Sequence, residues 1–122
     1  MTDMQIGLGC WPLSGAMSMG GRSAGYTSCA PEDAAKILDA AYDHGIRLFD
    51  TAQAYGCGHG ERLVGRALKS REATIVTKIG FTIDEDKREI IGPRREASEV
   101  RASVEESLTL LGSDLVDFVR LH

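Results

Sequence analysis

The sequence lacks the features that mark several large classes of protein. It has no basic excess, because 14 lysines and arginines stand against 18 aspartates and glutamates, for a net charge of -4. A nucleic-acid-binding domain usually carries a basic stripe, so no nucleic-acid partner is expected. No run of 18 or more apolar residues is present, and we expect no membrane span. The N-terminus has no apolar signal core, which makes the cytoplasm the expected location.

The sequence also has few cysteines and lacks a complete dinucleotide-binding motif. The three cysteines, Cys10, Cys29 and Cys57, are odd in number and widely spaced, which suggests no disulfide framework. Cys57 and His59 are not followed by a second ligand pair at metal-site spacing, so no metal site is expected. A complete G-x-G-x-x-G motif is missing, and residues 7–9 supply only a fragment of one.

The sequence does contain apolar strands that alternate with amphipathic helices. Its 122 residues are 43% apolar and 26% charged, which is typical of one globular domain with a single core. The expected order is strand, helix, strand, helix, strand, helix, strand, over residues 4–10, 31–44, 46–50, 60–68, 73–79, 97–111 and 115–121. The segments 11–29 and 80–96 are expected to be long loops.

This alternation predicts an α/β fold with a parallel sheet. Strands separated by helices of this size indicate successive βαβ units. The strands are apolar almost throughout, as parallel strands buried on both faces are. Two architectures remain open, a doubly wound sheet and a (β/α)8 barrel, and the missing glycine motif weakens the first.

Polar residues occupy the ends of the expected strands. Asp50 ends the second strand, Lys78 lies near the end of the third, and His122 ends the fourth. Active sites of parallel α/β folds form at the carboxyl ends of strands, and the alternation of side chains aims Asp50 and Lys78 toward one interior. Tyr55 follows in a glycine-rich turn. A lysine cation nearby favours the phenolate, so this tyrosine can deliver a proton to a substrate oxygen.

Each of these residues alone has an ordinary structural explanation. Asp50 could cap the turn after its strand, and Tyr55 could be a packed aromatic with a hydrated hydroxyl. Lys78 could extend its charged end to solvent, and His122 could be a terminal strand residue. Their joint arrangement on three successive strands favours the functional interpretation.

Several stretches of the chain resemble the aldo-keto reductase family. Residues 45–61 are similar to its Asp-Thr-Ala-x-x-Tyr-Gly signature, and residues 77–78 to its Thr-Lys strand. Residues 104–117, followed by residues 121–122, are similar to the approach to its fourth strand. The resemblance implies that residues 1–122 form a partial reductase domain, the N-terminal half of a (β/α)8 TIM barrel with four strands and three helices.

The resemblance also implies an NAD(P)H-dependent oxidoreductase that reduces an aldehyde or ketone to an alcohol, or the reverse. In that scheme Tyr55 is the proton donor and Lys78 makes its hydroxyl more acidic. Asp50 pairs with Lys78, and His122 orients or polarises the carbonyl group.

The cofactor implied by the resemblance is NADP(H), with NAD(H) as the alternative. The residues expected beside the cofactor are Gly9, Cys10, Trp11 and Asp50. The residues expected to contact the small carbonyl or alcohol substrate are Trp11, Phe81 and His122.

Three features depart from the family pattern. Gly60 stands where relatives often carry serine, and Arg120 is expected on the same side as His122 without an evident partner. A barrel of this kind takes about 250 residues. We therefore expect a truncated, poorly active half that lacks most of the cofactor site. The alternative is a non-catalytic half-barrel that self-associates through its open sheet edges, or serves as a binding or regulatory module.

Overall fold

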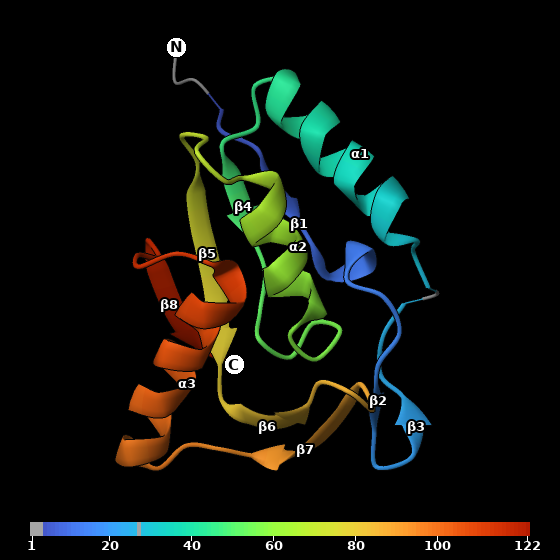
Figure 1. Ribbon diagram of the computed structural model, residues 1–122, viewed down its shortest axis with the longest axis vertical. Coiled ribbons are helices and arrows are strands. Elements are labelled where there is room, and N and C mark those ends of the chain that lie inside the picture. The colour runs from blue at the N-terminus through green and yellow to red at the C-terminus, as the bar shows by residue number, and fades with distance from the viewer. Residues whose placement is uncertain (1–3, 27) are drawn as a thin grey trace.

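A computed structural model describes residues 4–26 and 28–122 and contains a four-stranded parallel sheet (Figure 1). The strands lie in the order β1 (Gly7–Gly9), β4 (Leu48–Asp50), β5 (Thr74–Ile79) and β8 (Phe118–Leu121). This spatial order repeats the chain order, whereas a doubly wound sheet reverses its order at a switch point. The predicted parallel α/β fold is therefore confirmed, and the winding is that of a barrel.

Three helices connect these strands. They are α1 (Pro31–Asp43), α2 (His59–Ala67) and α3 (Ala97–Leu111). Pro31 begins α1 as predicted, and Gly112 ends α3 with a φ of 65°, a conformation that glycine adopts without strain. A capping box between Glu96 and Glu99 holds the start of α3. Among the described residues, no helix has the length and apolar character needed to cross a membrane.

The main core lies between the helices and one face of the sheet. Phe49 of β4 is fully buried there with Leu38 of α1, Val64 of α2 and Leu111 of α3. Burial of side chains of this size stabilises the fold by about 1.5–3 kcal/mol each. Because side chains alternate along a strand, the neighbours of Phe49 face the opposite surface. That surface is open, and Leu48 is 38% exposed on it.

Parts of the segments 11–29 and 80–96 form secondary structure, so the prediction of long loops is wrong for those parts. They form a short 3₁₀ helix (Trp11–Leu13) and a second sheet in the order β3, β2, β7, β6. The bounds are β2 (Ser18–Met19), β3 (Arg22–Ser23), β6 (Phe81–Asp84) and β7 (Glu89–Pro93). The parallel pairing of Ser18 with Glu89 joins residues far apart in sequence, and a local pattern cannot show it.

The start of α2 differs from the prediction as well. Gly58, with a φ of 90°, is the N-cap residue, and Gly60 lies inside the first turn rather than at the cap. A Cβ added to Gly60 would lie 2.5 Å from Ser14 Oγ and 2.9 Å from Tyr55 O. Close packing against these two residues therefore explains why glycine stands here instead of serine.

The buried face of α3 is not the predicted apolar stripe. Val100, Val104 and Leu108 are only half-buried, whereas Ser103 and Ser107 are fully buried. The apolar periodicity did not show that the helix packs its hydroxyl groups inward. Only Leu111, the last member of the stripe, is buried as predicted.

Candidate active site

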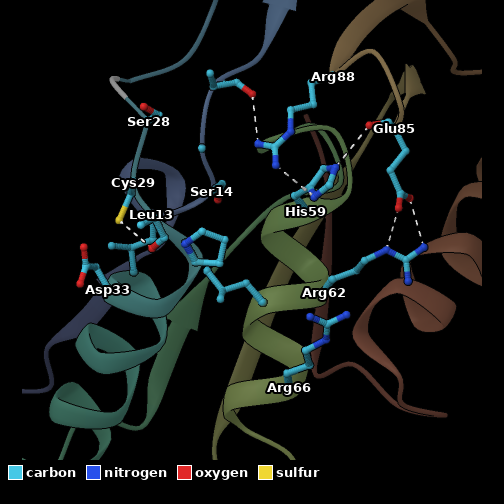
Figure 2. A pocket seen from close by; sticks show the side chains of 15 residues that line it. Leu13, Ser14, Ser28, Cys29, Asp33, His59, Arg62, Arg66, Glu85 and Arg88 are labelled. Carbon is cyan, nitrogen blue, oxygen red and sulfur yellow. Dashed lines mark hydrogen bonds and ion pairs between the residues drawn. The ribbon is translucent and has the colours of Figure 1, made fainter.

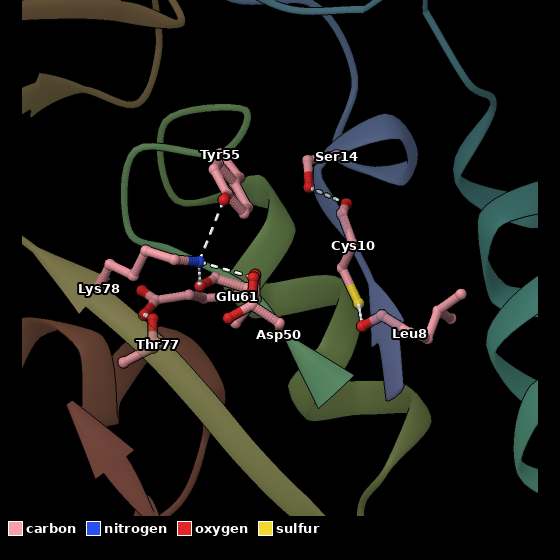
Figure 3. Close-up of polar contacts among 9 residues, drawn as sticks. Leu8, Cys10, Ser14, Asp50, Tyr55, Glu61, Thr77 and Lys78 are labelled. Atoms are coloured by element: carbon pink, nitrogen blue, oxygen red, sulfur yellow. Dashed lines mark hydrogen bonds and ion pairs between the residues drawn. The ribbon is translucent and has the colours of Figure 1, made fainter. Parts of the chain in front are cut away.

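The ammonium group of Lys78 joins the predicted polar residues. Its Nζ donates hydrogen bonds to Asp50 Oδ2 at 2.7 Å, to Thr51 O at 2.9 Å and to the Tyr55 hydroxyl oxygen at 3.0 Å (Figure 3). The Lys78 side chain is only 11% exposed. A buried ammonium needs partners of this kind, since desolvation of an unpaired charge is costly. The structure thus brings together Asp50, Tyr55 and Lys78.

The loop between β4 and α2 holds Tyr55 over β5. The Thr51 amide donates to Val76 O at 2.8 Å, and the Gln53 amide donates to Lys78 O at 2.9 Å. At Gly56, φ is 59° and an added Cβ would lie 2.0 Å from Ser14 O, so the loop requires glycine at this position. The glycine-rich turn seen in the sequence therefore has a geometric role in placing Tyr55.

His122 lies beside Tyr55 at the end of β8. Its amide donates to Ile79 O at 2.7 Å and extends the pairing of β5 with β8. The His122 ring stands nearly perpendicular to the Tyr55 ring, with centroids 5.8 Å apart, and packs in the same way against Phe81 at 5.4 Å. Five predicted residues therefore meet at the carboxyl end of β5: Asp50, Tyr55, Lys78, Phe81 and His122.

The imidazole of His122 favours its neutral form. Burial of the ring lowers the pKa of His122, the charges of Lys78 and Arg120 lower it further, and Asp50 opposes them. Arg120, predicted to lie on the same side as His122, is the register partner of Lys78 and shares its face. Within residues 4–26 and 28–122, Arg120 has no carboxylate at ion-pair distance.

Aromatic rings border Tyr55 on its other side. Trp11 stacks on Tyr55 with centroids 5.7 Å apart and an interplanar angle of 12°. Tyr26 packs edge-on against Trp11 at 4.9 Å. Tyr26 lies in a glycine- and serine-rich segment without periodicity, so no sequence signal indicated its place beside the site.

Gly9 and Cys10 differ in what they present to the site. Gly9 is the register partner of Asp50, and a Cβ added to Gly9 would meet nothing within 4 Å. Open space that could take the edge of a planar ring therefore adjoins Asp50. Cys10 is only 1% exposed and packs in the main core. Burial, with a smaller contribution from Asp50, raises the pKa of its thiol to about 12, so the thiol is not a nucleophile here.

A large cavity of the described residues does not carry this chemistry. It has a volume of about 1060 Å³, lies between the starts of α1 and α2, and is lined by none of the four predicted catalytic residues (Figure 2). Its charged residues are largely engaged: Arg62 binds Glu85 through two hydrogen bonds of 2.8 and 3.2 Å, and Arg88 donates to His59 Nδ1 at 3.3 Å. Size therefore does not identify the site, whereas the contacts of Lys78 do.

Sequence reasoning gave no role to Glu61, which lies in the first turn of α2. Its side chain is fully buried and accepts a hydrogen bond from the Thr77 hydroxyl. One signal was available, because Glu61 falls on the helix face that carries Val64 and Leu68. An acidic residue on an apolar stripe could have drawn attention to it.

Comparison with known proteins gives consistent matches along the chain. The model of the Aldo/keto reductase family matches residues 6–122. Aldo-keto reductase YhdN of Bacillus subtilis (strain 168) is 32% identical over 120 residues, which are 97% of this chain and 34% of that protein. D-threo-aldose 1-dehydrogenase of a Pseudomonas species is 31% identical, over 88% of this chain and 39% of its own length.

Solved structures agree with these matches. Aldo-keto reductase AKR11C1 from Bacillus halodurans superposes with a TM-score of 0.77 at 28% identity, over 97% of this chain and 35% of that one. An aldo/keto reductase from Klebsiella pneumoniae, solved with NADP and acetate, has a TM-score of 0.67 at 25% identity, over 95% and 34% of the two chains. The chain spans about a third of the length of these relatives.

Proposed function

Because this chain belongs to the aldo/keto reductase family of oxidoreductases, we propose that it carries the proton-transfer residues of an NAD(P)H-dependent carbonyl reduction, or of the reverse oxidation. The observation that carries the proposal is the position of Lys78 Nζ, 2.7 Å from Asp50 Oδ2 and 3.0 Å from the Tyr55 oxygen. In this proposal Tyr55 is the proton donor, and the substrate is a small aldehyde or ketone, or the corresponding alcohol.

Lys78 prepares the Tyr55 hydroxyl for proton transfer. Two of its ammonium contacts, to Asp50 and to Thr51 O, fix the direction of the third, which meets the Tyr55 oxygen. The positive charge stabilises the negative charge that develops on that oxygen when the proton leaves. In the reverse direction the same charge stabilises the phenolate that accepts the proton of the alcohol.

His122 places the carbonyl oxygen in this proposal. Its lowered pKa keeps the imidazole neutral at pH 7, so it can donate one hydrogen bond to the substrate oxygen. Its perpendicular contacts with Tyr55 and Phe81 hold the ring beside the proton donor. Trp11 and Phe81 then serve as walls for the apolar part of the substrate.

The residues present fit the reactive end of a nicotinamide cofactor, which supplies the hydride when bound. The open space beside Gly9 and the 37% exposed side chain of Asp50 give room and polarity for the ring, with Trp11 and the Cys10 backbone nearby. The NADP complex of the Klebsiella relative supports a cofactor of this class. We propose NADP(H), with NAD(H) as the alternative.

We further propose that the 122-residue chain alone turns over slowly. The sheet face that carries Asp50 and Lys78 has no helix over it among the described residues, and Leu48 on that face is 38% exposed. Water therefore reaches the space where hydride transfer would occur. Electrostatic catalysis weakens when water is not excluded from the site.

A second candidate function is self-association, which the exposed edge strand β8 favours. Leu115, Phe118 and Leu121 are 71%, 60% and 66% exposed along this edge. An unpaired apolar edge can pair with a second copy of the chain. Sedimentation equilibrium should then give a dimer that Phe118→Lys dissociates, and a monomer at all concentrations would remove this candidate.

A chimeric reductase tests the catalytic proposal, with residues 6–122 of this chain replacing the matched third of YhdN. We expect the chimeric reductase to oxidise NADPH in the presence of aldehydes, and Tyr55→Phe to lower kcat by about 10²–10⁴-fold. Tyr42→Phe is the matched control, since that hydroxyl lies away from Lys78, and kcat should stay within about twofold. Full activity in a folded Tyr55→Phe chimera would contradict the proposal.

A further inference from the structure

Glu61 is an ionisable side chain buried where an apolar one would pack at lower cost. It lies on the inner face of α2, is 0% exposed, and has no cation at ion-pair distance among the described residues. Burying an unpaired carboxyl group costs free energy unless hydrogen bonds compensate. The amphipathic pattern of α2 does not require an acid at this position, so its presence calls for a specific contact.

That contact is with Thr77. The Thr77 hydroxyl donates to Glu61 Oε1 (Figure 3). The Ser107 hydroxyl of α3 also acts on the carboxyl group, without a hydrogen bond of ordinary geometry. Burial raises the pKa of Glu61 to about 7, against the opposite effect of the two hydroxyls. Glu61 is thus bound to β5 by one side-chain hydrogen bond and is close to balance between its two protonation states at neutral pH.

No charged group on the elements around Glu61 forms an ion pair with it among the described residues. On β5, Lys78 faces the opposite side of the strand and binds Asp50. The other ion pairs of these elements leave Glu61 out. Arg62 pairs with Glu85, and Arg94, the residue after β7, pairs with Glu106 of α3. Arg71 pairs with Asp39 of α1. The hydroxyls of Thr77 and Ser107 are therefore the polar groups that act on Glu61.

The Glu61–Thr77 bond connects the two segments that carry the proposed proton-transfer residues. Thr77 immediately precedes Lys78 on β5, and Glu61 follows Tyr55 in the same loop and helix. The ladder between β4 and β5 ends at Val76, so past that point β5 is held on this side by the Gln53 N to Lys78 O bond and by the side-chain bonds of Lys78. The hydrogen bond between the Thr77 and Glu61 side chains adds a connection from β5 to α2 on the helix-facing side of the strand.

We propose that Glu61 is a positioning residue, which acts through Thr77 to hold Lys78 in place beneath Tyr55. The proposal rests on the proposed roles of Tyr55 and Lys78. It goes beyond them because Glu61 touches neither the substrate space nor the Lys78 ammonium. Loss of the tie would let the Lys78 segment shift and lengthen the contact between the ammonium and the phenol oxygen.

Amide hydrogen exchange of the complete 122-residue chain tests this positioning. The Gln53 amide, which donates to Lys78 O, reports on the local tie, and the Leu38 amide of α1 reports on global unfolding. In Thr77→Val we expect Gln53 exchange to rise about fivefold more than Leu38 exchange, the factor that one net hydrogen bond gives. Thr77→Ser, which keeps the hydroxyl, should return the ratio to within about twofold of the original.

A merely structural role predicts a different result. Thr77→Val would then accelerate exchange at Gln53 and Leu38 by the same factor, and that outcome would overturn the proposal. An unchanged Gln53 amide would overturn it equally. Glu61→Leu should match Thr77→Val, and the double variant should show no further increase, because the two side chains share one bond.

A second readout needs no destabilised variant. In the unmodified chain, the protection of the Gln53 amide relative to Leu38 should change between pH 5 and pH 8 with a midpoint near 7. Glu61→Gln, which keeps the shape and the acceptor oxygen, should abolish that change. A pH-independent ratio in the unmodified chain, or a change that persists in Glu61→Gln, would overturn the proposal.

These readouts do not depend on turnover, so they separate this inference from the proposed function. A Tyr55→Phe chimera with full activity would remove the catalytic proposal while the exchange results still stood. An unchanged ratio of Gln53 to Leu38 exchange in Thr77→Val, together with loss of activity in Tyr55→Phe, would overturn the positioning role of Glu61 and leave the catalytic proposal intact.

Discussion

Two polar clusters lie on opposite faces of β5, and they are built from adjacent residues. On the open face, Lys78 binds Asp50 and Tyr55, and Asp50 remains 37% exposed. On the helix face, Thr77 binds Glu61, which is fully buried. The first cluster contains opposite charges that neutralise each other next to open space. The second contains an acid with one hydroxyl partner and no solvent contact.

The difference in burial suits the two clusters to different tasks. The charge of Lys78 stays available to a developing anion because the cluster opens toward solvent, with the Asp50 side chain 37% exposed. Glu61 meets no ligand, and its pKa is raised to about 7 because burial penalises its charge. In the proposed function the first cluster acts on the substrate, and in the further proposal the second holds the strand that carries Lys78.

Removal of the Lys78 charge should have the largest effect. In the chimeric reductase, Lys78→Met should lower kcat by about 10²–10⁴-fold, because no other side chain of the described residues forms a hydrogen bond with the Tyr55 oxygen. The steady-state rate of NADPH oxidation measures this. Lys36→Met, at a lysine whose side chain is 80% exposed, is the control and should leave kcat unchanged. Equal rates of NADPH oxidation in Lys78→Met and Lys36→Met would contradict the role proposed for the Lys78 charge.

The next effect is on stability as a function of pH. Glu61 has an ordinary pKa of 4.5 and a folded-state pKa of about 7, so the folded state binds more protons than the unfolded state between these values. Stability should therefore fall as pH rises from 5 to 8, by an amount on the order of 3 kcal/mol. Urea denaturation at both pH values measures it, and Glu61→Gln should flatten the profile.

His122 on the open face acts in the opposite direction. Its pKa is lowered from 6.5, so its contribution to stability is present above that value and is lost as pH falls through it. A His122→Asn background removes this opposing slope. If the Glu61→Gln chain in that background kept the loss of stability toward pH 8, the assignment of the titration to Glu61 would be wrong.

Gly60 should give a smaller effect that depends on packing alone. Gly60→Ser places a Cβ 2.5 Å from Ser14 Oγ and 2.9 Å from Tyr55 O, and we expect a loss of about 1–3 kcal/mol in the free energy of unfolding. Gly92→Ala is the matched control, since an added Cβ there meets nothing within 4 Å. Urea denaturation measures the free energy of unfolding of both variants. Equal values would contradict the prediction and would show that the residues around Gly60 shift at no cost to make room for the side chain.

The smallest effect is expected at the ion pair between Arg94 and Glu106, which links the second sheet to α3. Arg94 Nη1 lies 2.7 Å from Glu106 Oε2, but Glu106 is 48% exposed, so solvent screens the pair. Arg94→Gln should cost less than about 1 kcal/mol in urea denaturation. Lys36→Gln, which breaks a looser pair at 3.9 Å, should cost nothing measurable. A larger loss of unfolding free energy in Arg94→Gln would contradict this prediction and would show that the ion pair stabilises the fold despite its exposure to solvent.

The open-face cluster was predictable from the sequence because its members sit at strand ends. Strand alternation places Asp50 and Lys78 on one face, and the glycine-rich turn fixes the return of Tyr55. The four parallel strands and three helices were predictable for a related reason, since apolar periodicity is a local signal. The roles of the residues in catalysis and cofactor binding stay predictions.

The helix-face cluster and the second sheet were not predictable in this way. Glu61, Thr77 and Ser107 come from three elements, and no single stretch of sequence shows that their side chains meet. The pairing of Ser18 with Glu89 likewise depends on tertiary contact. Local patterns describe one element at a time, so contacts that exist only after elements pack are outside their reach.

A double-variant cycle in the chimeric reductase tests the central claim most directly. If Lys78 acts through the oxygen of Tyr55, then Tyr55→Phe and Lys78→Met remove the same interaction, and the combined variant should lose no more activity than the larger single loss. The measurement is kcat for NADPH oxidation in the parent and the three variants. Losses that multiply in the combined variant would show that the two residues act independently and would contradict the account.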